Sequence, residues 1–450
     1  MSYRLPAGLT RTATAIATLA LAAGCTDFLK ASNPSAIQAD DLANPLYINL
    51  MVNGVIGEFQ QVVDDVDLRS GIYADELFAN HPFFEEREID KRNIDLGNGT
   101  YPLVLYVPMQ RSRFLADSVT GRLKVFFGDS ASRDLRVART LAYAGYSYEL
   151  LAENVCTVPV NGSAPFTPEE LTTQFTIPRL QEAITVAMAA RAATQSVGAR
   201  ASADSIINWA RVGIARAALY TNDKTTAKTY AAQVPAAFAF ASYYSAQNTR
   251  EYDGVAEAAT NAAWVSLEPS YKLLRDPRVP HDSLPRSVQS IGQGNADTVG
   301  TGSTRVIGAY VPNAGIMYSA YNGTIAGARI ARDGYIKIAT GLEAQYIIAE
   351  VDGPIATTLA FVNSRRAVGG QTSVVLAGNA LMAELREQRR RDLFMDGHRL
   401  SDLRRYLKYQ NLDLFPKGVY ANSSTGETFN PATCWPLPLA EIAGNPNVPR

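Results

Sequence analysis

A charge-dense stretch near the carboxyl end, Glu387–Arg405, limits the possible folds more than any other part of this sequence. Its arginines and carboxylates stand close together around one glycine, and apolar residues recur around them at helical spacing: Leu385, Phe394, Leu400, Leu403 and Tyr406. A segment with an apolar face packs against a core, and a charge buried there is costly unless it is paired. The pattern therefore predicts two helices separated by the glycine, with Asp392, Asp396 and Asp402 bonded to nearby arginines.

Length and composition are those of an ordinary globular protein. Of the 450 residues, 47% are hydrophobic and 19% are charged, which allows a large core. The formal net charge of −1 gives no electrostatic footprint for nucleic acid or anionic lipid. Tyrosine is abundant, with 22 residues against 16 phenylalanines. A tyrosine combines an apolar face with a hydroxyl, which suits helix packing as well as surfaces that hold polar ligands.

The amino terminus has the layout of a secretory signal. Arg4 and Arg11 precede an apolar run over residues 13–23 that is too short to span a bilayer. Small residues before Cys25 indicate a lipobox, so we expect removal of residues 1–24 and lipidation of Cys25. Cleavage by an ordinary signal peptidase beside a chance cysteine is the alternative. Two or three acyl chains would hold the mature protein on a membrane, and the sequence predicts a protein that is anchored rather than spanning.

Two further cysteines, Cys156 and Cys434, stand far apart in the sequence. An exported protein can oxidise such a pair to a disulfide, which would tie the helical middle of the chain to its carboxyl-terminal segment. Two buried free thiols are the competing interpretation, because a disulfide requires a Cα separation that the sequence does not give.

Helical periodicity predicts a mostly α-helical protein. Apolar residues recur at helical spacing over residues 46–66, 101–116, 134–153 and 177–194. Ser205–Val234 is similar to a tetratricopeptide-type hairpin, with Ala215 and Ala227 where two helices would approach closely and a turn at residues 221–223. Glu343–Gly370 is predicted to form a second, degenerate hairpin of this kind.

The middle of the chain, about residues 235–340, loses this periodicity and gains Gly, Ser, Asn and Pro with aromatic residues between them. A long irregular stretch in a compact domain is usually functional or disordered, and the aromatic content argues against disorder. We expect loops and short strands over the helical scaffold. The acidic run Asp64-Asp65-x-Asp67 lacks the pattern of a calcium loop, so we interpret it as the solvated end of a helix.

No motif of a metal site, nucleotide site or nucleophilic enzyme is present. The three histidines, His81, His281 and His398, are widely separated and match no metal-ligand spacing. We therefore expect no metal and no cofactor. A glycosidase needs only two carboxylates, and 43 acidic residues always leave a hydrolase as an alternative, although nothing marks a pair.

The carboxyl-terminal motifs resemble those of the SusD/RagB family of outer-membrane nutrient-binding lipoproteins. That family's signature runs Glu-Arg-x-x-Glu-Leu-x-x-Glu-Gly-His-Arg-x-x-Asp-Leu-Arg-Arg, and here Gln388 stands near its Arg while Asp392 and Asp396 replace Glu. A closing Trp-Pro-Ile-Pro…Glu-Ile…Asn-Pro-Asn element is matched by Trp435-Pro436-Leu437-Pro438 and the residues up to Asn447. The predicted lipoprotein signal is a third match.

The resemblance implies a tetratricopeptide-like helical-repeat scaffold with an irregular, loop-rich lobe. It implies one SusD-like domain over residues 25–450, with repeats mainly in 46–234 and 343–408 and a ligand lobe at about 235–340. It further implies a surface lipoprotein of the outer membrane that is not an enzyme. Such a protein binds a glycan or oligosaccharide, or else a peptide, and delivers it to a TonB-dependent SusC-like transporter. Its signature would be structural rather than catalytic: Asp392, Asp396, His398, Arg399, Asp402 and Arg404.

Ligand contacts are implied on the loop after the first helix and on the irregular middle segment: Tyr73, Asp75, Phe83, Phe84, Trp264, Tyr310, Tyr318 and Tyr321. Sugar rings stack on aromatic faces while their hydroxyls bond to polar side chains, although core packing is the commoner role of any single aromatic residue. Two other functions remain open at this point. One is a lipid-anchored glycan hydrolase, and the other is a helical-repeat assembly adaptor without a small-molecule ligand.

Overall fold

The computed structural model describes residues 42, 44–79, 83–258, 265–274, 276–279, 281–283, 308–310, 333–420 and 426–449. The chain divides into two units, residues 1–51 and 52–450. The first unit contributes the 3-10 helix η2 (Pro45–Tyr47) and the first turn of α2 (Ile48–Ala74). The second holds the remaining elements. Among the described residues, no helix is long and apolar enough to cross a membrane.

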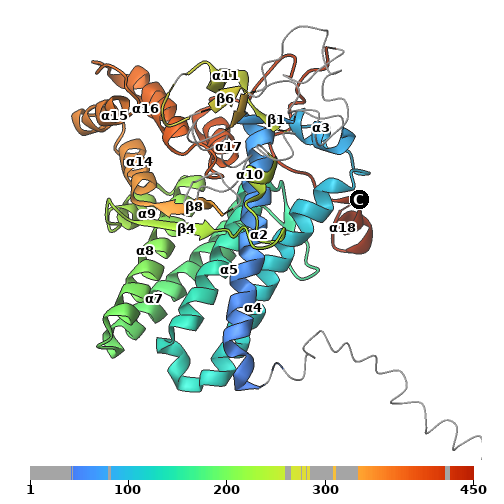
Figure 1. Ribbon diagram of the computed structural model, residues 1–450, viewed down its shortest axis with the longest axis vertical. Helices are drawn as coiled ribbons and strands as arrows, with labels where there is room; N and C mark the ends of the chain where they lie inside the picture. Colours follow the sequence, from blue (N-terminus) through green and yellow to red (C-terminus); the bar gives the residue numbers. More distant parts are fainter. Residues whose placement is uncertain are drawn as a thin grey trace, which may run out of the picture. The chain divides into compact units, whose positions relative to one another are not determined.

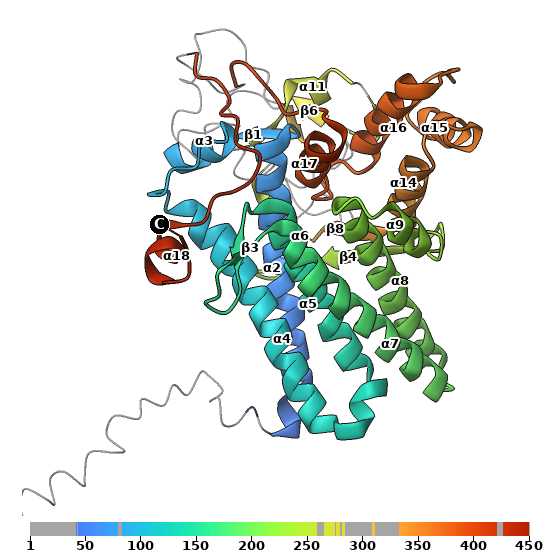
Figure 2. The same cartoon turned by 180° about the vertical axis from the view of Figure 1, so that it is seen from behind.

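Long helices dominate the second unit. After α2 come α4 (Val107–Phe127), α5 (Leu135–Asn154), α7 (Ile177–Ala193) and α8 (Val197–Tyr220). From α4 on, each of these helices packs against the next one in alternating directions (Figures 1 and 2). The helix stripes predicted from periodicity are thus confirmed, although α2 runs on to Ala74 because Leu68, Ile72 and Tyr73 continue its buried face.

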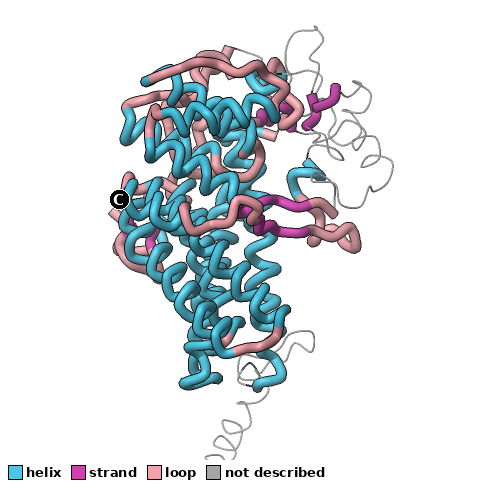
Figure 3. Tube along the Cα trace, turned by 90° about the vertical axis from the view of Figure 1, so that its left-hand side faces the viewer, coloured by secondary structure: helices cyan, strands magenta, loops and turns pink. Residues whose placement is uncertain are grey.

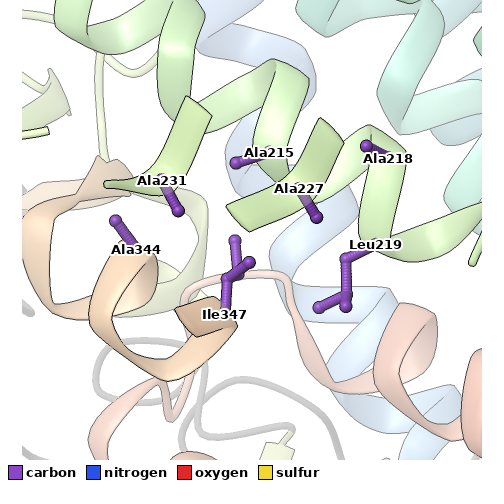
Figure 4. Close-up of a cluster of buried hydrophobic side chains, with 7 residues drawn as sticks. All are labelled: Ala215, Ala218, Leu219, Ala227, Ala231, Ala344 and Ile347. Carbon is purple, nitrogen blue, oxygen red and sulfur yellow. The ribbon is translucent and has the colours of Figure 1, made fainter. Parts of the chain in front are cut away.

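The two predicted hairpins are present and pack on each other. Helix α8 turns at residues 221–223 into α9 (Lys224–Ala231), and α14 (Gly341–Asp352) turns into α15 (Ala356–Val368). Ala215 and Ala227 meet in one buried cluster with Ala344 and Ile347 of α14 (Figure 4). Small side chains at this crossing let three helices approach closely, as a repeat scaffold requires.

Short antiparallel ribbons complete the middle of the chain (Figure 3). Strand β1 (Leu77–Ala79) pairs with β5 (Val265–Leu267), β2 (Val158–Pro159) with β3 (Pro165–Phe166), β4 (Ala239–Tyr243) with β8 (Tyr335–Thr340), and β6 (His281–Ser283) with β7 (Gly308–Tyr310). The described part of residues 235–340 therefore consists of loops and short strands, as predicted, together with two helices of three and four residues, α10 (Gly254–Ala256) and α11 (Pro269–Lys272). The other short helical segments are α3 (Phe84–Asp90), η3 (Pro102–Tyr106), η4 (Gly128–Arg133), α6 (Pro168–Leu171), η5 (Thr172–Thr176) and α18 (Leu439–Gly444).

The charge-dense stretch forms two helices around its glycine, as its sequence predicts. Helix α16 (Gly378–Asp392) ends before Gly397, and α17 (Arg399–Gln410) begins after it. Gly397 has a φ of 74°, in the left-handed region that glycine occupies without strain. This turn lets the two helices change direction while both keep their charged residues inside the protein.

A disulfide joins Cys156 to Cys434, with 5.1 Å between their Cα atoms and 278 positions between them in the sequence. Backbone hydrogen bonds flank it, because the Cys156 N–H donates to the Trp435 carbonyl and the Trp435 N–H donates to the Asn154 carbonyl. Trp435 is buried against Tyr73 and other rings. The carboxyl-terminal segment is thus attached to the end of α5 by covalent, polar and apolar contacts.

The acidic run in α2 does not form a solvated helix end, and that interpretation was wrong. Asp64 is 7% exposed and Asp67 2% exposed, well inside a helix that continues to Ala74. The Gly254 N–H at the start of α10 donates to an Asp64 carboxylate oxygen over 2.9 Å. Burial raises the pKa of Asp64, and the neighbouring carboxylates of Asp65 and Asp253 raise it further.

Candidate functional site

The β1–β5 ribbon brings together the two segments that were predicted to contact a ligand. Helix α2 ends at Ala74, and β1 follows at once and pairs Leu77 with Leu267 of β5. The Glu268 N–H donates to the Glu76 carbonyl over 3.0 Å and extends the pairing. Strand β7 also contacts β5, so the loop after the first helix and the irregular middle segment meet at one place. We call the β1–β5 ribbon with the start of α3 the ribbon site.

Two exposed aromatic side chains head α3 at the ribbon site. Phe83 is 49% exposed and Phe84 is 64% exposed, and the Lys91 ammonium lies 5.8 Å from the centre of the Phe84 ring. Large apolar rings that remain exposed in succession are costly in water and are typical of a binding surface. Flat exposed rings can stack on a sugar ring, while the Lys91 ammonium beside them is held by the Glu427 carboxylate over 3.0 Å.

Tyr73 and Asp75, also predicted as ligand contacts, form hydrogen bonds with other residues of the protein. Tyr73 is buried, its hydroxyl donates to the Cys434 carbonyl over 2.8 Å, and burial raises its pKa. Asp75 accepts two hydrogen bonds of 2.6 Å from the Arg399 guanidinium. Both residues therefore attach the ribbon site to the carboxyl-terminal part of the protein.

Two glutamates at the ribbon site could not be found by sequence reasoning. Burial raises the pKa of Glu268 to about 7, with a smaller contribution from the Asp75 charge. Glu76 is buried, and one of its oxygens accepts from the Met395 N–H over 3.1 Å while burial raises its pKa. Glu268 is thus partly protonated near neutral pH and can donate or accept a hydrogen bond. Its burial depends on the β1–β5 pairing, which leaves no local signal in the sequence.

The other predicted ligand contacts fall in the part of the chain that is not described. Trp264, Tyr318 and Tyr321 lie outside the described residues, although Trp264 directly precedes β5. Tyr310 is described only as a backbone position of β7, paired with His281. Cys25 also lies outside the described residues.

The signature residues of α16 and α17 make buried ion pairs beneath the ribbon site. Asp402 accepts from Arg389 over 2.6 Å and from Arg405 over 2.8 Å. Burial alone would raise the pKa of Asp402, but the two arginines outweigh it and hold that pKa below the ordinary value. Asp392 pairs with Arg365 of α15 over 2.7 Å. The expected pairing of Asp392 and Asp402 with arginines is therefore confirmed.

The remaining signature residues are also directed inward. The His398 Nε2 lies 3.2 Å from the Glu343 carboxylate, which also accepts from Arg216. Arg404 donates to the Ala152 carbonyl over 3.0 Å, and Asp396 is buried. These contacts suit a structural role for the signature, which remains a prediction for mutagenesis. Within the described ranges, no group of three or more His, Cys, Asp or Glu side chains could hold a metal ion.

Comparison with known proteins identifies the fold. No family model and no curated protein matches the sequence. The surface glycan-binding protein A of Bacteroides thetaiotaomicron, solved in complex with laminarihexaose, is 14% identical with a TM-score of 0.63, over 90% of this chain and 98% of that one. A SusD superfamily protein of Bacteroides fragilis is 12% identical with a TM-score of 0.60, over 90% and 99%. A laminarin-binding SusD-like protein is 14% identical with a TM-score of 0.56, over 90% and 98%.

This chain therefore has the SusD-like fold, as the motif resemblance implied. The mostly helical architecture with a repeat scaffold and a loop-rich part is confirmed over nine-tenths of the chain.

Proposed function

We propose that this protein is a SusD/RagB-type lipoprotein of the outer membrane that binds a glycan and delivers it to a TonB-dependent SusC-like transporter. The observation that carries the proposal is the ribbon site, where Phe83 and Phe84 are exposed beside Lys91 on a SusD-like fold. One structural neighbour was solved in complex with laminarihexaose and another is described as laminarin-binding, which makes laminarihexaose and laminarin the first ligands to test. Recognition would use stacking and hydrogen bonds without covalent chemistry, and a peptide is the alternative ligand.

Calorimetry of the mature chain with laminarihexaose and a panel of other oligosaccharides tests ligand binding. Replacing both Phe83 and Phe84 with alanine should weaken binding of the ligand by about fivefold to a hundredfold, because each lost ring contact removes about 0.5–1.5 kcal/mol. Phe114 on α4 is 57% exposed and lies outside the ribbon site, so Phe114→Ala is the matched control. Equal weakening by both changes, or binding that survives the double change, would argue against this site.

Delivery and membrane anchoring need a separate experiment in native membranes. We expect the tagged, full-length protein to co-purify with a large TonB-dependent barrel in mild detergent, with the helical repeats contacting the barrel. The Cys25→Ala variant should leave the membrane fraction, since the lipid at Cys25 is the proposed anchor. Recovery of the protein without a barrel would favour the hydrolase or the adaptor function instead.

A further inference from the structure

The cations on the exposed face of α3 are bound by one carboxylate of the carboxyl-terminal segment. Arg87 and Lys91 are the only cationic residues of the sequence 83–91. The Lys91 ammonium donates to one oxygen of Glu427 over 3.0 Å, and the Arg87 guanidinium donates to the other oxygen over 3.2 Å. Phe84, Arg87 and Lys91 stand at helical spacing and share one face of the helix. The exposed Phe84 ring therefore has two cations on its own face, and both are already paired.

Glu427 is held in place by several contacts with α3 and with its own segment. The Asn430 N–H donates to the Lys91 carbonyl over 2.8 Å. The Tyr420 hydroxyl donates to Glu427 over 2.9 Å and accepts from Arg87 over 2.6 Å. Hydrogen bonds from Lys91 and Tyr420 lower the pKa of Glu427, so its carboxylate is charged at neutral pH. The ion pairs are thus part of a defined arrangement between the two segments.

We propose that Glu427 makes the ribbon site select neutral over acidic glycans, an inference that rests on the proposed function. An acidic sugar stacked on Phe84 would need a cation to offset its charge, and Glu427 already binds both cations of this face. Glu85, which directly follows Phe84, adds a further negative charge to the start of α3. A neutral sugar ring meets no such repulsion and can stack on the phenylalanine.

Calorimetry with laminarihexaose, and with the same hexasaccharide oxidised to carboxylates at C6, tests this selectivity. The two probes share length and linkages, and the wild type should bind the neutral one more tightly. Glu427→Gln keeps the shape of the side chain but removes its charge, so Lys91 and Arg87 become available to the ligand. Affinity for the acid should rise about fivefold, as for one partly exposed ion pair, while affinity for the neutral probe changes little. Equal weakening of both probes, or an unchanged affinity for the acid, would overturn the proposal.

Glu169→Gln is the matched control. Glu169 also pairs with a lysine, Lys408, and accepts from a tyrosine hydroxyl, that of Tyr409, over 3.2 Å. It lies on α6, outside the ribbon site. The control variant should bind both probes as the wild type does. A rise in acid affinity equal to that of Glu427→Gln would mean that net charge alone is responsible, and it would also overturn the proposal.

Fluorescence quenching separates this inference from glycan binding itself. In the variant Phe84→Trp an indole reports the charge near α3, since Trp209 and Trp435 are fully buried. Adding Glu427→Gln should raise the ratio of quenching by iodide, an anion, to quenching by neutral acrylamide at constant ionic strength. The same comparison with Phe84 retained gives the background from Trp264. A raised ratio without binding of any glycan would refute the proposed function and leave the anion-repelling role of Glu427 intact. An unchanged ratio would overturn that role even if laminarihexaose binds.

Discussion

Asp402 on α17 and Asp64 on α2 are both buried carboxylates, yet their surroundings differ. Asp402 lies between the guanidinium groups of Arg389 and Arg405, while Asp64 lies near two other carboxylates and accepts from backbone N–H groups. The pKa of Asp402 is lowered in spite of burial, and the pKa of Asp64 is raised by burial. In one region burial strengthens the ion pairs, and in the other it disfavours the charge.

The two carboxylates illustrate two environments in which a helix buries an acidic side chain. The α16–α17 segment uses paired charges to fix the geometry of helices beneath the ribbon site, so each partner depends on the other. On α2, an Asp64 carboxylate oxygen instead accepts a hydrogen bond from the Gly254 backbone N–H of α10. A carboxylate there can be neutral and still serve as a hydrogen-bond acceptor for Gly254. Removing a charge should therefore be damaging in the first region and nearly harmless in the second.

The largest effect is expected for Asp402→Ala. The change leaves the buried guanidinium of Arg389 without its carboxylate, while Arg405 keeps its pair with Glu350. Breaking a buried pair in this way typically costs about 3–5 kcal/mol, measured as the free energy of unfolding in urea. Asp413→Ala removes an exposed pair with Lys417 and should cost about 1 kcal/mol or less. If Asp402→Ala cost no more than this control, the ion pairs of the signature would not determine the geometry of α17. Ligand affinity of the folded variant should remain normal.

A middle-sized effect is expected for Gly254→Ala, which probes the close contact of α10 with α2. A Cβ at this position would lie 2.9 Å from an Asp64 oxygen, so the carboxylate or the α10 backbone must shift. Overpacking of this kind costs about 1–3 kcal/mol, measured by thermal unfolding. Gly121→Ala on α4 has open space around the added atom and should be neutral or stabilising. Equal melting temperatures of the two variants would show that the contact is loose.

Sequence reasoning succeeded where partners lie close together in the chain. Asp402 finds Arg405 three positions away on its own helix and Arg389 on the preceding one, so the charge pattern predicted the pairing. Asp64 meets Gly254 from 190 positions away, and its burial could not be read from the local acidic run. The ribbon site shows the same limit. Phe83 and Phe84 are exposed there, and their role as ligand contacts stays a prediction. The inward contacts of Tyr73 and the raised pKa of Glu268 follow from long-range pairing.

The smallest effect is expected for Asp64→Asn, and pH decides whether the change raises or lowers the free energy of unfolding. Because the folded pKa of Asp64 lies above its unfolded value, the folded state retains a proton that the unfolded state has lost. The stability that Asp64 contributes is therefore fully present below the unfolded pKa and is lost as pH rises through the folded pKa. At neutral pH, Asp64→Asn should match or exceed the wild type by about 1 kcal/mol or less, because no cation is left unpaired. Urea unfolding between about pH 5 and pH 8 should show that the free energy of unfolding of the wild type rises relative to that of the variant as pH falls. If the free energy of unfolding of the wild type rose relative to the variant with rising pH instead, Asp64 would be charged and paired like Asp402, and the contrast between the two regions would fail.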